Sequence, residues 1–91
     1  MSDPSAALPP ATFEFLVFSL RAQAEIHLGL LPDPDGVAQT PDLPMAKHAI
    51  DLLAVLAEKT RGNLALHEQR LVDNALTELR FRYVQAVNPA P

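Results

Sequence analysis

The side chains best suited to chemistry in this chain of 91 residues are its three histidines, because imidazole titrates near neutral pH and binds metal ions. They are His27, His48 and His67. A zinc site needs three or four converging ligands, usually with a close pair such as His-x-x-x-His, and these histidines lie far apart in the sequence. The Glu-x-x-His pattern of di-iron bundles is absent as well. The sequence therefore predicts no metal site and no cofactor, and it places the histidines at or near the surface.

Covalent catalysis and nucleotide binding find no support either. Ser19 is the only serine beyond the N-terminal stretch, and its neighbours Phe18 and Leu20 make a poor setting for an activated nucleophile. Its small side chain suits close helix packing instead. The sequence contains no glycine-rich phosphate loop and no cysteine. We therefore expect a protein that is not an enzyme.

The most polar compact stretch, residues 58–63, allows two interpretations. In the functional one it forms a corner that binds an anion, RNA or a partner, with Arg80 and Arg82 nearby. The corner residues are Lys59, Thr60, Arg61 and Asn63. In the structural one a helix ends here: Gly62 supplies left-handed backbone, and the Thr60 hydroxyl bonds back to the preceding turn. The structural interpretation is favoured, and the functional one is kept as the alternative.

The run Arg80–Tyr83 alternates basic and aromatic residues, as some RNA-binding surfaces do. On a helix, however, Arg80 and Arg82 point to different sides, and Tyr83 belongs to an apolar stripe. The net charge of −4 also argues against a general nucleic-acid binder. Nucleic-acid binding is therefore not expected.

The elements that must position these residues are marked by proline and glycine. All nine prolines and all three glycines lie outside the segments 13–28, 45–61 and 63–88. Because proline lacks a backbone donor and glycine destabilises a helix by about 1 kcal/mol, these segments predict helices. We predict an all-α, three-helix domain over residues 12–87, between disordered tails at 1–11 and 88–91. Its helices are expected over about 12–28, 42–61 and 65–87.

The helix ends can also be predicted from single residues. Thr12 is a suitable N-cap for the first helix, and Gly29 is suited to end it. Thr40 or Asp42 can cap the second helix. The third helix has Ala65 where a side-chain cap is needed, so its start is expected to be irregular.

The first predicted helix is apolar on two sides, and this is the main functional signal. At about 100° per residue, one apolar face consists of Phe13, Leu16, Val17, Leu20 and Ala24. A nearly opposite face contains Phe15, Phe18, Ala22 and Ile26. Two further helices would cover one face well and the other poorly, and large exposed apolar patches mark interaction sites.

We therefore predict a non-enzymatic interaction or scaffold protein that self-associates through this helix into a homodimer or higher helical bundle. The predicted interface residues are Phe15, Phe18, Ser19, Ala22, Ile26 and Phe81. Two alternatives stay open: a monomer that sandwiches the first helix between the other two, and an unidentified protein partner.

The membrane and the secretory pathway are not expected. The apolar stretch 13–31 contains Glu14, Arg21 and Glu25, each costly at a bilayer centre, and the N-terminus lacks a basic region typical of a signal peptide. The absence of cysteine is compatible with a reducing compartment. We expect a cytoplasmic protein.

A distinctive pattern occupies residues 50–64, and it consists of Ile50, Asp51, Leu53, Leu56, Lys59, Thr60, Gly62, Asn63 and Leu64. Further matching positions are Phe15, Leu16, Ser19, Leu20, Leu28, Gly29, Glu68, Leu79, Arg80, Tyr83 and Val84. Over roughly residues 13–85 this pattern resembles the bacterial family catalogued as domain of unknown function 1844. The sequence departs from it at Ala65, where a threonine-like cap is expected. The resemblance implies a small, cytoplasmic, helical protein and supplies no catalytic residue, substrate or partner.

Overall fold

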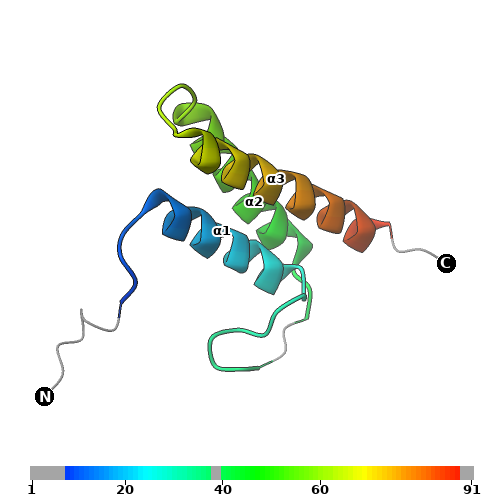
Figure 1. Cartoon of the computed structure of the whole chain (residues 1–91). Coiled ribbons are helices and arrows are strands. Elements are labelled where there is room, and N and C mark those ends of the chain that lie inside the picture. Colours follow the sequence, from blue (N-terminus) through cyan, green and yellow to red (C-terminus); the bar gives the residue numbers. More distant parts are fainter. Residues whose placement is uncertain (1–7, 38–39, 89–91) are drawn as a thin grey trace, which may run out of the picture.

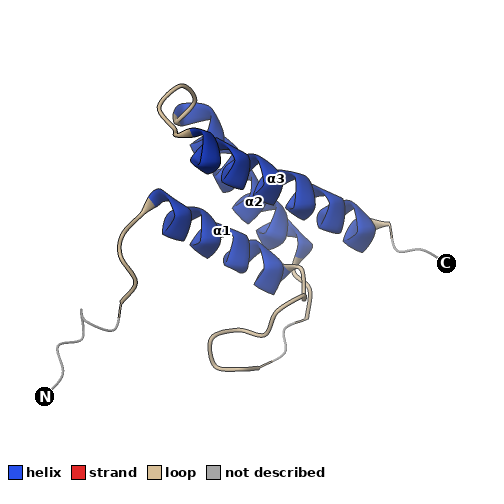
Figure 2. Ribbon diagram, in the orientation of Figure 1, coloured by secondary structure: helices blue, strands red, loops and turns tan. Residues whose placement is uncertain are grey.

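A computed structural model of the chain describes residues 8–37 and 40–88, and these fold into three α-helices (Figure 1). Helix α1 spans Phe13–His27, α2 spans Leu43–Lys59 and α3 spans Leu66–Val87. The part of the chain that is described contains no strand (Figure 2). Helices α1 and α3 run in the same direction, and α2 returns against both. The predicted all-α, three-helix fold is confirmed.

Helix α1 begins and ends as its sequence predicts. The Thr12 hydroxyl oxygen accepts a hydrogen bond of 3.0 Å from the Phe15 N–H. At the other end, Gly29 has a φ of 81°, and its N–H donates to the Ile26 carbonyl oxygen while the Leu30 N–H donates to that of Glu25. This pair of bonds is a Schellman motif, whose left-handed residue favours glycine.

Helix α2 is capped by Asp42, one of the two predicted candidates. The Asp42 carboxylate accepts from the Met45 N–H at 3.1 Å, and Pro44 lies in the first turn, where its missing donor costs nothing. The Asp42 N–H also donates to the His27 carbonyl oxygen at 2.7 Å. This bond ties the end of α1 to the start of α2, so the two helices form an antiparallel hairpin.

The start of α3 is regular, and the prediction of an irregular start is wrong. Alanine has no side-chain acceptor, so the forward half of a capping box cannot form at Ala65. The reciprocal half does form, because the Glu68 carboxylate accepts from the Ala65 N–H at 2.8 Å. With Ala65 held extended at ψ 158°, its carbonyl oxygen accepts the first helical bond from Gln69.

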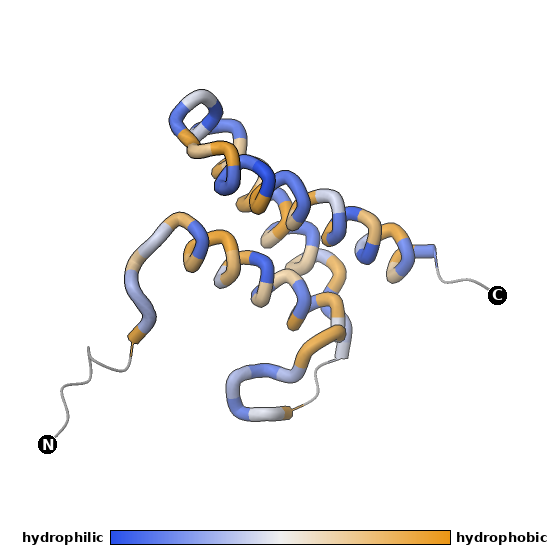
Figure 3. The backbone as a smooth tube through the Cα atoms, in the orientation of Figure 1, coloured by the Kyte–Doolittle hydropathy of each residue, from blue (hydrophilic) through white to orange (hydrophobic). Residues whose placement is uncertain are grey.

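One apolar core fills the space between the three helices. Its largest fully buried side chains are Leu53, Leu79, Val17 and Val72. Apolar positions recur along every helix (Figure 3), as the predicted stripes require. Not every apolar position is buried, since Leu16, from the first apolar face predicted for α1, and Val87 on α3 are exposed. Leu16 lies at the edge of its stripe, and Val87 is the last residue of its helix.

The predicted tails fall partly outside the described residues, which exclude 1–7 and 89–91. Residues 8–11 and 88 are non-helical and exposed. Among the described residues, no helix combines the length and the apolar character that crossing a bilayer requires.

Candidate interaction surface

The second apolar face of α1 is exposed at its two phenylalanines and half-buried at Ala22 and Ile26. Phe15 is 38% exposed and Phe18 is 63% exposed, while Val17 and Ala24 on the opposite side are buried. Helices α2 and α3 contact each other as well as α1, so α1 is not sandwiched between them. The two phenylalanine rings stack on one another, with 6.3 Å between their centroids. Two aromatic side chains therefore lie next to solvent on one side of a single helix.

Small residues lie beside these rings along α1. Phe15, Ser19, Ala22 and Ile26 follow one another at steps of four, three and four residues, which is the spacing of a helix–helix seam. We call these four residues the α1 seam. The Ser19 hydroxyl donates to the Phe15 carbonyl oxygen at 2.9 Å. A helix packed on the seam would therefore bury no unpaired hydroxyl donor there, and the small side chains would let it approach closely.

The N-terminal end of the α1 seam borders a shallow, mainly apolar groove. The groove is lined by Ala11, Thr12, Phe13, Phe15, Leu16 and Ser19. It is open to solvent along one side, so it suits a side chain of a packed helix better than an enclosed small molecule.

A second exposed apolar stripe lies on α2, and the sequence reasoning missed it. Met45, Leu52 and Val55 are 44%, 43% and 51% exposed. We call these three residues the α2 stripe. Together with His48 they follow at steps of three, four and three residues, again the spacing of a helix–helix seam. That spacing is the signal from which the sequence could have predicted the stripe.

Phe81 is the one predicted interface residue that is not on α1. It lies on α3, is 58% exposed, and shares a side of that helix with the exposed Val84. Its place in an interface stays a prediction.

The corner between α2 and α3 has the features of the structural interpretation. The Thr60 hydroxyl donates to the Leu56 carbonyl oxygen at 2.7 Å, and the Asn63 N–H donates to that of Thr60 at 2.9 Å. Gly62 has a φ of 86°. Lys59, Arg61 and Asn63 are exposed.

The expected closeness of the two C-terminal arginines to this corner is wrong. Arg80 follows the first residue of α3 by about 21 Å of helix rise, so it lies far from the corner. There it lines a pocket with Lys47, Asp51 and Tyr83, among other residues. Arg82 is paired with Glu78 at 3.0 Å, as the sequence spacing predicts.

Replacing Gly62 should test the structural role of the corner. A side chain at position 62 would meet no atom within 4 Å, so any loss of stability comes from the left-handed backbone. We expect Gly62→Val to lower the free energy of unfolding by about 1–2 kcal/mol, and Gly62→Asn to lower it less, since asparagine tolerates this conformation. Urea denaturation followed by circular dichroism measures both. Equal stability of the valine variant and the wild type would contradict the assignment.

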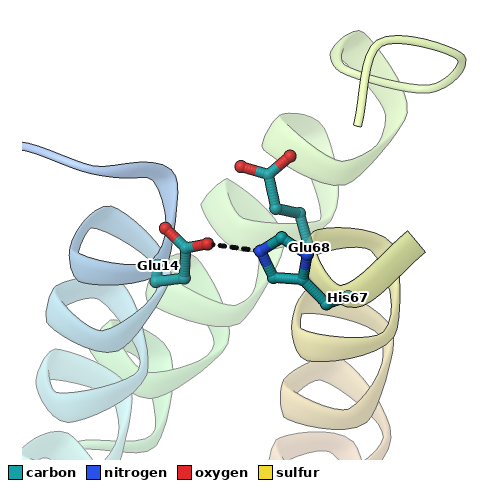
Figure 4. Close-up of side chains that lie close together, drawn as sticks. All are labelled: Glu14, His67 and Glu68. Atoms are coloured by element: carbon teal, nitrogen blue, oxygen red, sulfur yellow. Dashed lines mark hydrogen bonds and ion pairs between the residues drawn. The ribbon is translucent and has the colours of Figure 1, made fainter. Parts of the chain in front are cut away.

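The starts of α1 and α3 lie side by side and are joined by a contact between His67 and Glu14 (Figure 4). The Nε2 atom of His67 is 2.8 Å from a carboxylate oxygen of Glu14, and Glu68 lies next to them. The pKa of the Glu14 carboxyl is lowered, first by a hydrogen bond from its own backbone N–H and next by the hydrogen bond from His67. Sequence reasoning could not find this pair, because 53 residues separate its members.

Glu14, His67 and Glu68 also form a group that could hold a metal ion, since their ligand atoms lie within 4.8 Å of one another. Two observations favour a structural role instead. Glu68 already accepts from the Ala65 N–H. Both carboxylates also lie in the first turn of a helix, where the helix dipole is positive and favours anions over cations. We therefore assign the group to the joining of α1 and α3.

The contact between Glu14 and His67 should make the stability of the fold depend on pH in the acid range. Because the pKa of folded Glu14 lies below its ordinary value of 4.5, the carboxylate stabilises the fold above that pH and loses this effect as the pH falls. We expect the Glu14→Gln variant to lose less stability than the wild type between about pH 6 and pH 3. Thermal melts across this range measure it.

His67→Ala is the matched variant for this acid dependence, because it removes the inter-helix partner and keeps the backbone donor. The stability that this variant loses between about pH 6 and pH 3 should lie between the losses of the wild type and of Glu14→Gln. If the melting temperatures of all three proteins fell by the same amount over this pH range, the explanation would be refuted.

The sequence of the chain was also compared with known proteins. Residues 10–85 match the family described as a domain of unknown function, DUF1844. The chain belongs to this family. The matched residues include the α1 seam, the α2 stripe and the α2–α3 corner, so all three surfaces lie within the DUF1844 region. No curated protein and no solved structure matches the chain. The family description names no activity, so the function has to be argued from the surfaces themselves.

Proposed function

We propose that this protein is a small, non-enzymatic helical interaction or scaffold protein that self-associates through α1. The observation that carries the proposal is the stacked pair Phe15 and Phe18, which lies exposed on a helix whose opposite side is taken up by the core. Full burial of a large apolar side chain contributes about 1.5–3 kcal/mol, so covering this face has a clear driving force.

A second copy is the occupant that we propose for this face. In a two-fold dimer the same patch lies on both subunits, so each copy supplies the apolar surface that the other needs. The seam suits this use, because the small Ser19 and Ala22 are flanked by the larger Phe15 and Ile26. We propose the cytoplasm as the compartment, which agrees with the absence of cysteine from the sequence.

Light scattering coupled to size-exclusion chromatography tests the proposal directly. The chain has a mass of 9.9 kDa, and we expect a particle of twice that mass or a higher multiple at micromolar concentration. A particle of 9.9 kDa at that concentration would refute self-association.

The alternative function is an anion- or RNA-binding module at the α2–α3 corner. One observation favours it: Lys59 and Arg61 are exposed, and neither forms an ion pair among the described residues. Thr60 would contribute to anion or RNA binding only by shaping the corner, because its hydroxyl already donates to the Leu56 carbonyl. If this function holds, the wild type is retained on a heparin or RNA column and the Lys59→Glu, Arg61→Glu double variant is not. Equal elution of the two proteins would exclude it.

A further inference from the structure

The α1 seam alone is too small for a stable dimer. Helix α1 has 15 residues and is therefore about 22 Å long. Stable protein interfaces cover about 800 Å² on each partner, which a strip of about 22 Å by 10 Å does not approach. If the chain self-associates through α1, a second element must take part in the contact.

The position of α3 shows which sides of α1 and α2 are free. On α1, Glu14 points toward α3, because it contacts His67. Leu16 follows Glu14 by two residues and so lies about 200° round the helix, away from α3, where it is exposed. On α2, Lys47 lines a pocket with the α3 residue Tyr83. Met45 precedes Lys47 by two residues and therefore lies away from α3 as well.

The α2 stripe continues this free side along α2. Leu52 follows Met45 by seven residues, which returns it to the same side of the helix, and Val55 lies next to it. Because the bond between Asp42 and His27 holds α1 and α2 together as a hairpin, Leu16 and the α2 stripe lie on one face of that hairpin. The α1 seam forms its outer edge.

We infer that two copies of this chain associate through the face of the α1–α2 hairpin that is turned away from α3, so that four helices meet at the interface. This inference rests on the proposed self-association and names the surface that completes it. Two observations carry it: the area that a stable dimer requires, and the matched spacing of the two apolar stripes. The α1 seam alternates steps of three and four residues, and so does the α2 stripe when His48 is counted with it; this is the pattern that packs helices side by side in four-helix bundles.

Charged substitutions on the α2 stripe test the inference. In the Leu52→Asp, Val55→Asp double variant two carboxylates would enter the interface without partners, and the dimer dissociation constant should rise at least about 100-fold. The matched control is Leu66→Asp, which places one such charge on an exposed apolar position of α3, far from Phe81. Sedimentation velocity over a dilution series measures the three proteins, with circular dichroism as the check on folding.

A second measurement does not depend on charged variants. The chain has no cysteine, so Leu52→Cys and Leu66→Cys each offer one site for an environment-sensitive fluorophore. On dilution through the dissociation range, the spectrum of the label at position 52 should shift toward that of a solvent-exposed site, and the spectrum of the label at position 66 should not change. This readout reports on the surface even if the double aspartate variant fails to fold.

The results separate the inference from the proposed function. Loss of the dimer in the α2 double variant, with the Leu66→Asp protein unchanged, supports the two-helix face. A dimer that keeps its wild-type dissociation constant in the α2 double variant, with no spectral shift at position 52, would overturn the inference and leave association through α1 intact. A wild-type protein that is monomeric would remove the proposed function, and the inference with it.

Discussion

Replacing Phe15 by aspartate is expected to convert the associated protein into monomers, with a dissociation constant raised at least about 100-fold. An aspartate in the α1 seam would lose its water on association and find no polar partner, which costs several kcal/mol for an unpaired carboxylate. Ile26→Asp should act in the same way from the other end of the seam. Sedimentation velocity on purified protein measures both variants.

The fold itself should survive the Phe15 substitution, because this side chain lies outside the core of the chain. Leu66→Asp is the matched control: Leu66 is exposed on the first turn of α3, where the helix dipole favours a carboxylate. It should remain associated like the wild type. Phe81→Asp decides the separate prediction for Phe81, since dissociation of that variant would place α3 in the interface. An associated Phe15→Asp protein would refute the role of the α1 seam.

The helices could be predicted from the sequence because their limits depend on local chemistry. Proline and glycine act on the backbone of their own segment, and an N-cap such as Thr12 or Asp42 bonds a donor three residues away. The wrong expectation for the start of α3 has the same local origin. The prediction required both halves of a capping box, and alanine cannot form its half; the bond from the Ala65 N–H to the Glu68 carboxylate, which is the other half, forms without it.

The site could be predicted only in part, because an exposed face is defined by what the other helices leave uncovered. The periodicity of α1 shows two apolar sides, and the packing of Val17 into the core decides that the side of Phe15 is the open one. On α2 the sequence contains two adjacent leucines, Leu52 and Leu53. Only the position of the other two helices decides that Leu53 is buried and Leu52 is exposed. The contact between Glu14 and His67 depends on the same arrangement.

Self-association also has a consequence for stability. A chain of this length buries only about 60–65% of its unfolded surface, so its monomer has a small margin of stability. Because association stabilises the folded state by mass action, the melting temperature of the wild type should rise with protein concentration, while that of Phe15→Asp should stay constant. The Phe15→Asp variant therefore offers a monomeric background in which the core can be measured by itself.

In this background, Leu53→Ala should lower the free energy of unfolding by about 2–5 kcal/mol, which is the range for a buried leucine cut back to alanine. Leu53 is 0% exposed at the junction of the three helices, and the cavity left behind would be enclosed on all sides. Its neighbour provides the control, because Leu52 is the same residue type on the same helix and is 43% exposed.

Leu52→Ala should cost the Phe15→Asp monomer less than about 1 kcal/mol, since its side chain contributes little to the core. In the wild-type background the same substitution should weaken association, because Leu52 belongs to the proposed interface. Urea denaturation of the monomers and sedimentation of the associated proteins separate the two effects. Similar losses for Leu52→Ala and Leu53→Ala in the monomer would show that α2 is buried on both sides, and the free face on which association depends would not exist.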